Sequence, residues 1–415
     1  MQHILKTILL LVICISCLAH IVSCGLQVKA EELGKDLSPV APKGASLTSD
    51  GKLAVYQFSI SLMKQLRAEG NENVSPLSVM LALGMTQNGA GGQTKAQMEQ
   101  VLGMPADTLN PFLYAYLSSL EGDEVLKVAQ SIWFHENNLS ISDAFLQTNK
   151  DYYNAEMYAA PFDKTTLSDI NRWVSHHTDD MIPKLLDQID PSMVMFLLSA
   201  MAFDAKWESA YKKSDIQKDY PFIKADGSVH HVDMMVSEED IYLTNEDGAH
   251  GFLKFYKGGR YAFAGILPPE NTTPDAYLAS LDGAKLQDLL TTFHRGTKVE
   301  AGLPAFTFEM KIKLNEALQN MGMTDAFDGS VADFSGIGTA GGNLAIDEVL
   351  HSTFIDVGAE GTRAAAVTSV GIKCTSAGPM DSITIYLNRP FIYAIMDTET
   401  GLPIFLGTVY TPETN

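Results

Sequence analysis

The spacing of apolar and polar residues along the chain predicts a mixture of helices and strands. Leu53, Tyr56, Ile60 and Met63 recur at the spacing of one helix face, which predicts a helix in this region. The run over 193–201 is almost continuously apolar, as expected of a strand that is buried on both faces. The same reasoning predicts a strand over 126–134, a helix over 170–186, and two strands within 252–267 that are joined at Gly258 and Gly259.

Residues 361–380 interrupt this pattern with a stretch of small and polar side chains. Alternate residues from 362 to 372 are uncharged and mostly small, whereas the other set carries Arg363 and Lys373. Because alternate side chains of a strand take opposite faces, one face of this stretch suits burial and the other suits water. Glycines and the Gly378-Pro379 pair are loop residues. The stretch therefore has the features of a loop that can become a strand, although these residues alone also fit an ordinary connector or a short helix over 364–366.

Composition sets the size and charge of the protein. The 415 residues are 46% hydrophobic and only 19% charged, which is enough for one large domain or two smaller ones. The formal net charge of −21 disfavours nucleic acids and anionic lipid surfaces as partners. The chain contains no Gly-x-Ser-x-Gly elbow, no cysteine protease signature around Cys374 and no cofactor motif, so we expect neither an enzyme nor a cofactor or metal site.

The first 45 residues have the features of an export signal and a linker. Residues 1–23 carry a single charge, Lys6, and are mostly apolar from position 4, as in a signal peptide. The segment Ile21 to Cys24 resembles a bacterial lipobox, which predicts acylation of Cys24; the alternative is an ordinary signal peptide that is cut nearby. We therefore expect an exported protein, either a lipoprotein facing the cell surface or periplasm, or a secreted one. Residues 24–45 are expected to be an exposed tether.

The region after the loop carries specific motifs. Residues 385–395 read Ile-Tyr-Leu-Asn-Arg-Pro-Phe-Ile-Tyr-Ala-Ile, residues 403–407 read Pro-Ile-Phe-Leu-Gly, and the stretch begins with Glu360-Gly361-Thr362 followed by Ala364-Ala365-Ala366. Together these segments resemble the serpin family over 46–412, without an internal linker. The resemblance implies one α+β serpin domain, with a large central antiparallel-rich sheet, additional sheets, about nine helices and an exposed reactive loop. It also implies a strand, a helix and a short loop at 299–308, 312–321 and 327–334.

The resemblance implies that the chain is a suicide inhibitor of serine proteases. In serpins, the protease cleaves the loop and forms an acyl bond to it, and the loop then inserts into the central sheet and traps the enzyme. Fourteen residues after Gly361, the bond Thr375–Ser376 is expected to be cut, with Cys374 as its neighbour and with Lys373 and Met380 as alternative sites. The small residue at 375 favours elastase-like or subtilisin-like proteases. The alternative is a non-inhibitory serpin that serves as a surface-anchored binding or carrier protein.

Further site residues are implied by the same resemblance. The hinge of the loop would consist of Glu360, Gly361, Thr362, Ala364, Ala365 and Ala366, where small inward residues permit insertion. Arg363 stands where the family usually has an acid. The shutter, where the sheet must part, would consist of Ser75, Ser78, Ser199 and His351, with Ser199 replacing the usual asparagine, and Trp207 would lie at the breach, under the top of the sheet.

The partners implied by the resemblance are a target serine protease, in a covalent complex, and a membrane through the lipid on Cys24. Heparin is not expected as a partner, because residues 102–124, which are basic in heparin-binding serpins, contain no Lys or Arg. We expect a monomer.

Overall fold

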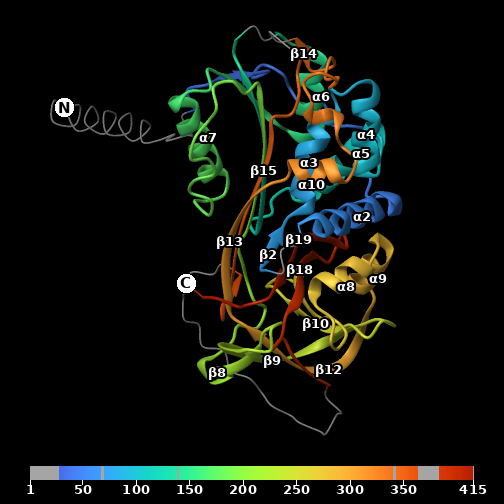
Figure 1. Cartoon of the computed structure of the whole chain (residues 1–415), viewed down its shortest axis with the longest axis vertical. Coiled ribbons are helices and arrows are strands. Elements are labelled where there is room, and N and C mark those ends of the chain that lie inside the picture. Colours follow the sequence, from blue (N-terminus) through green and yellow to red (C-terminus); the bar gives the residue numbers. More distant parts are fainter. Residues whose placement is uncertain (1–27, 67–69, 138–139, 340–342, 363–382, 415) are drawn as a thin grey trace, which may run out of the picture.

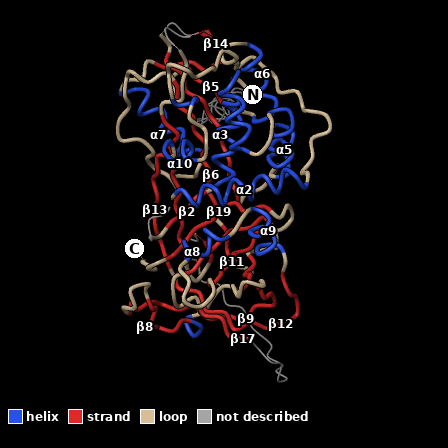
Figure 2. Tube along the Cα trace, turned by 45° about the vertical axis from the view of Figure 1, so that its right-hand side comes forward, coloured by secondary structure: helices blue, strands red, loops and turns tan. Residues whose placement is uncertain are grey.

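Two large β-sheets and surrounding helices form an elongated molecule. The computed structural model describes residues 28–66, 70–137, 140–339, 343–362 and 383–414. Figure 1 shows that β13 (Phe306–Lys313) and β15 (Glu348–Val357) run along the longest axis, with α7 (Lys164–His177) on one side of them and several helices on the other. Most helices surround the upper part of the molecule in this view, and strands of the second sheet make up most of the lower part, as the tube view in Figure 2 also shows.

The first large sheet has eight strands and is mainly antiparallel. Its order is β1 (Glu31–Leu33), β5 (Glu156–Ala160), β3 (Leu126–His135), β6 (Met195–Phe203), β15, β16 (Gly361–Thr362) and β7 (Ala205–Lys206), and β13 also pairs with β15. Only the contacts of β3 with β5 and of β6 with β15 are parallel among these pairs of the described strands.

The second large sheet has nine strands, and a two-stranded sheet completes the set. The order of the nine is β17 (Ile383–Tyr386), β12 (Phe293–Pro304), β9 (Val229–Thr244), β10 (His250–Phe255), β11 (Tyr261–Leu267), β18 (Phe391–Asp397), β19 (Leu402–Val409) and β2 (Glu72–Val74), with β8 (Ile216–Ile223) on β9. The pair is β14 (Gly338–Thr339) with β4 (Ser140–Ile141).

Nine α-helices lie within the described residues. Besides α7 they are α2 (Ser49–Gln65), α3 (Pro76–Gln87), α4 (Gly92–Leu102), α5 (Ala106–Ser119), α6 (Asp143–Tyr153), α8 (Pro274–Ser280), α9 (Gly283–Thr291) and α10 (Asn315–Asn320). Every residue of α3 is buried, as expected of a helix at the centre of the core. None of the helices in this described part is long and apolar enough to cross a membrane.

The expected α+β architecture is confirmed, including the large antiparallel-rich sheet and the helix count. The helix of 53–63 is α2, and its N-terminus is capped by Thr48, whose hydroxyl accepts a bond from the Gly51 amide at 3.1 Å. The apolar run of 193–201 forms the buried strand β6. The two strands expected within 252–267 are β10 and β11.

Three predicted boundaries are wrong. The helix expected to reach residue 186 ends at His177, because Asp179 and Asp180 take positive φ angles of 47° and 59° that no helix contains. The strand expected over 299–308 is divided at Ala305 into the ends of β12 and β13. The helix expected over 312–321 is only α10, since β13 continues to residue 313.

The expected tether over 24–45 is also partly wrong. Glu31–Leu33 pair with Met157–Ala159 as strand β1, at the edge of the first large sheet. Just before it, the backbone amides of Lys29 and Ala30 donate to one carboxylate oxygen of Asp169 at 2.8 and 3.1 Å. The carboxylate belongs to a residue that is almost completely buried in α7, so this part of the segment is fixed to the domain.

Candidate functional site

The central feature of the first sheet is a slot between the neighbouring strands β6 and β15. Among the described residues, β6 and β15 pair only at one end, where Phe196 and Leu197 lie opposite Glu348 and Val349. Beyond this point, residues 198–204 and 350–356 face each other across the slot, and these facing edges have no ladder pairing with any described residue. The facing edges of β6 and β15 are equal in length, so the sheet can accept another strand between them.

The start of the predicted loop already occupies the open end of this slot. Thr362 lies opposite Val357 of β15 on one side and Ala205 of β7 on the other, so β16 is a short strand between them. The amide of Gly358 closes the turn by donating to the carbonyl of Gly361 at 2.9 Å. A Cβ atom on Gly361 would lie 2.1 Å from the Ala205 carbonyl oxygen, so only glycine fits there.

The side chain of Thr362 is buried against an aromatic pair. It is 2% exposed, and its hydroxyl lies 2.5 Å from the hydroxyl of Tyr256. Trp207 stacks on Tyr256, with ring centroids 4.4 Å apart and planes inclined by 13°. The indole nitrogen of Trp207 donates to the Gly358 carbonyl at 2.8 Å, and its backbone amide donates to the Glu360 carbonyl at 2.9 Å. The predicted hinge and the tryptophan expected at the breach are therefore in direct contact.

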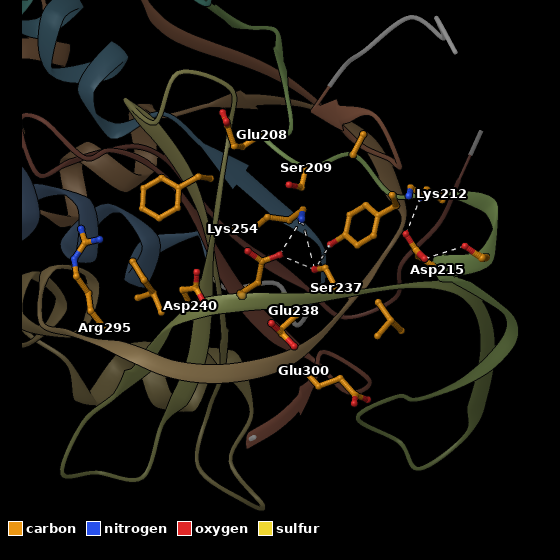
Figure 3. Close-up of a pocket in the computed structure, with 17 residues that line it drawn as sticks. Glu208, Ser209, Lys212, Asp215, Ser237, Glu238, Asp240, Lys254, Arg295 and Glu300 are labelled. Carbon is orange, nitrogen blue, oxygen red and sulfur yellow. Dashed lines mark hydrogen bonds and ion pairs between the residues drawn. The ribbon is translucent and has the colours of Figure 1, made fainter. Parts of the chain in front are cut away.

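A buried ion pair supports this aromatic pair and was not expected from the sequence. Lys254, which is 2% exposed, donates to Glu239 at 2.9 Å, and its ammonium lies 5.5 Å from the Trp207 ring centroid and 4.3 Å from that of Tyr211. Figure 3 shows Lys254 directed toward Ser237 between the strands of the second sheet. The only sequence signal is a charged residue within the apolar run of β10, which demands a buried partner.

The structure brings together the four residues expected at the shutter. Ser75, the N-cap of α3, donates its backbone amide to Nε2 of His351 at 3.0 Å and accepts the Ser78 amide on its hydroxyl at 3.3 Å. The Ser78 hydroxyl donates to the Ser199 hydroxyl at 2.8 Å. These bonds connect α3 to β6 on one side of the slot and to β15 on the other.

Two further contacts at this position were missed by sequence reasoning. The Ser75 hydroxyl donates to the sulfur of Met201 at 3.0 Å, and the Thr353 hydroxyl donates to the Asn73 carbonyl at 2.7 Å. Neither methionine nor threonine is distinctive in a buried strand, so no signal could have identified them.

Several predicted residues lie outside the described part of the chain. These are Cys24, Ala364, Ala365, Ala366, Lys373, Cys374, Thr375, Ser376 and Met380.

A partly opened sheet, with Gly361 and Thr362 paired at its open end, is the arrangement that the serpin resemblance implies. Residues 53–412 match the family model described as serpin (serine protease inhibitor), and the chain belongs to the serpin family. Members of this family are generally protease inhibitors that form complexes with target proteases, and they are generally not enzymes.

Particular relatives agree with this assignment. An uncharacterized serpin-like protein of Thermococcus kodakarensis is 32% identical over 87% of this chain and 85% of its own. Human neuroserpin is 29% identical over 87% of this chain and 92% of its own. The crystal structure of tengpin, a thermophilic serpin, in the native state superimposes with a TM-score of 0.87 and 44% identity, covering 92% of this chain and 100% of that one. The relatives of this family are mostly secreted extracellular proteins.

The histidine between α3 and β15 predicts a loss of stability in acid. Burial lowers the pKa of His351 from 6.5 to about 4, because the charged ring would be desolvated. The Nε2 atom of the neutral ring accepts the Ser75 amide. The unfolded chain binds the proton first, so stability is present above pH 6.5 and is lost as the pH falls toward 4. The loss would be on the order of 3 kcal/mol over this range.

The measurement is the midpoint of chemical unfolding for the intact protein and for His351→Gln between pH 7.5 and 4.5. Glutamine keeps an acceptor for the Ser75 amide but does not titrate, so the variant should lose less stability in acid. The difference between the two proteins removes the effect of other groups, such as Glu72, whose pKa burial raises to about 8. Parallel curves for the two proteins would show that His351 has no such role.

Proposed function

We propose that this serpin inhibits serine proteases by inserting its cleaved loop between β6 and β15. The observation that carries the proposal is the position of Gly361 and Thr362, which are already paired between β15 and β7 at the open end of the slot. Further insertion continues this pairing, once the hydrogen bonds of Ser75 and Ser78 across the slot and the pairing of Leu197 with Val349 have separated. The unpaired edges of the two strands supply the hydrogen-bonding groups for it.

Continuing the register of Thr362 predicts the environment of each loop residue after insertion. On β15, alternate residues from Val349 to Val357 are buried. They lie on the same face of the sheet as Thr362, which is opposite Val357. The small uncharged residues of the loop would therefore enter the buried face. In this register Ala364 reaches Ile355 and Phe203, Ala366 reaches Thr353 and Met201, Thr368 reaches His351 and Ser199, and Val370 reaches Val349 and Leu197.

The same register gives Arg363 a specific environment. It would lie between Asp356 of β15 and Asp204, which follows β6, on the opposite face from Thr362. The basic residue that departs from the family pattern is therefore complementary in charge to its expected neighbours. Because Asp204 is exposed to water, this contact would add little to the driving force for insertion.

Inhibition requires that the loop inserts before water hydrolyses the acyl bond to the protease. The protease serine attacks the carbonyl of Thr375, the bond to Ser376 breaks, and the new amine leaves with the C-terminal part while an ester links the loop to the enzyme. With a dozen or more new hydrogen bonds at roughly 1 kcal/mol each, insertion would release on the order of 10–20 kcal/mol. The uncleaved protein would then be held by a kinetic barrier.

We propose that the target is an elastase-like or subtilisin-like protease, because Thr375 is small and uncharged. Cleavage after Lys373 would indicate a trypsin-like enzyme, and cleavage after Met380 would leave five more residues between the hinge and the ester. We further propose that heparin is not an activator, since residues 102–124 contain no Lys or Arg, and that the chain acts as a monomer.

Incubation of the mature protein with pancreatic elastase and with subtilisin should yield a covalent complex that survives denaturing electrophoresis. The released C-terminal peptide, identified by mass spectrometry, should begin at Ser376. A peptide that begins at Cys374 or Asp381 would move the reactive bond to Lys373 or Met380. Cleavage without any covalent complex, also with trypsin, would contradict the proposed inhibition and favour the binding or carrier role.

Substitution at the hinge should convert the inhibitor into a substrate. Thr362→Arg would place a charge in the buried site beside Tyr256, at a cost on the order of several kcal/mol, so insertion should be too slow to trap the acyl enzyme. The matched control is Arg363→Gln, which changes the adjacent outward residue. The ratio of inhibitor consumed to enzyme trapped should rise strongly for Thr362→Arg and change little for Arg363→Gln. Equal effects would contradict the assigned faces.

We propose that Cys24 carries a lipid anchor, on the basis of the segment Ile21 to Cys24. Two or more acyl chains would give stable membrane attachment, where a single chain gives only marginal binding. Expression in a bacterial host should yield a membrane-bound protein with an acylated N-terminal Cys24, as measured by mass spectrometry. Cys24→Ala should abolish the modification. A mature wild-type N-terminus downstream of residue 24 without acylation would refute the anchor.

A further inference from the structure

One edge of β3 is unpaired within the described structure and lies in a groove. β5 pairs with β3 only over Ser131–His135, so on that side residues 126–130 extend past the first residue of β5. The groove has a volume of about 780 Å³ and is lined by this part of β3, the C-terminal parts of α5 and α6, and the turn over 121–124. It is separate from the slot between β6 and β15.

The hydrogen-bonding groups on this edge can be assigned from the pairing on the other side. The amide of Asp204 donates to the Val125 carbonyl at 3.1 Å, in register with the antiparallel pairs of β3 and β6. Because such pairs alternate, the peptide groups of Leu126 and Val128 point away from β6. The amide of Leu126 does bond outward, to the Asp123 carboxylate at 3.0 Å. The amide and carbonyl of Val128 are thus presented to the groove.

A buried polar side chain in the groove also lacks a partner. Gln130 is 4% exposed, and neither its amide nitrogen nor its amide oxygen has a hydrogen-bond partner among the described residues. Its side chain lies on the same face of β3 as those of Leu126 and Val128, and it lines the groove. Leaving such a group unsatisfied costs roughly 1–3 kcal/mol, which a bound polar group would offset.

The walls of the groove combine apolar residues with more acidic than basic ones. The two lysines of the lining are Lys127, which pairs with Asp179, and Lys150. Leu117 and Leu120 of the α5 region are partly exposed beside the partly exposed Val128. At the rim, the exposed Glu121 and Glu124 make no side-chain hydrogen bond or ion pair with any residue that the structure describes. An extended segment with alternating apolar and basic side chains would complement this surface.

We propose that this groove binds an extended segment of a partner protein, which adds to the edge of β3 at Val128. The backbone of the segment would pair with the Val128 peptide groups and supply polar groups to the Gln130 amide. Its apolar side chains would meet Leu117 and Leu120, and its basic side chains would reach Glu121 and Glu124. A second copy of this chain is disfavoured as the occupant by its net charge of −21. The site requires no loop insertion, so it stands apart from protease inhibition.

The probe is a fluorescent eight-residue peptide of alternating Lys and Val, measured by anisotropy against the mature full-length protein. The block isomer, with four Lys followed by four Val, is the control for charge and composition. The alternating peptide should bind with a dissociation constant below about 0.1 mM, and at least about fivefold more tightly than the isomer, since only alternation matches a strand edge.

Two variants test the edge itself. Val128→Pro removes the outward amide and leaves the pairing with β6 intact, because proline is tolerated on edge strands; it should weaken binding about tenfold. Val128→Thr keeps the amide and the branched shape, and should change affinity less than about twofold. If Val128→Pro does not fold, the double variant Glu121→Gln with Glu124→Gln should still weaken binding and reduce its salt dependence.

Unchanged binding by Val128→Pro, equal affinities for the two peptides, or no binding below 1 mM would each overturn the proposal. Formation of a dimer whose mass depends on Val128 in the absence of peptide would show a second copy as the occupant and would also overturn it.

Discussion

The architecture depends on how the two ends of the slot between β6 and β15 are held. At one end β6 and β15 bond directly, and at the other Gly361 and Thr362 stand between β15 and β7. Between these ends, the facing backbone edges of two long strands have no ladder partners among the residues that the structure describes. The stacked pair of Trp207 and Tyr256 packs against Thr362, so Gly361 and Thr362 keep the sheet from closing at the place where a loop would enter.

The bonds in the middle of the slot act against its widening. Ser78 reaches Ser199 on one strand, and Ser75 reaches His351 on the other, so one helix terminus bonds to both sides. Strand insertion would have to pass between these contacts, which are few and short-ranged. Such an arrangement suits a barrier that is overcome once, because a small number of hydrogen bonds sets its height and many more would form afterwards.

The sequence predicted those parts in which local chemistry determines structure. β6 is recognisable because it is apolar on both faces. Prediction failed where distant residues decide. β1 reads as a charged linker, yet Glu31 pairs with Ala159 far along the chain, and the buried Lys254 depends on Glu239 in another strand. The end of α7 depends on left-handed backbone at Asp179, which composition does not indicate.

The position of β1 has a consequence for orientation at a membrane. Glu31 lies opposite Ala159 of β5, and the pairing of β5 with β3 and of β3 with β6 places Met195 at the same height of the sheet. Met195 lies beside the closed end of the slot. Because Lys29 is fixed to Asp169, about 17 Å of extended chain at most would separate it from Cys24. Figure 2 shows β5 near one end of the molecule and β17 near the other. A lipid on Cys24 would therefore set the closed end of the slot toward the bilayer and the opposite end outward. An enzyme captured far from the membrane would then be delivered against the lipid surface and stored there.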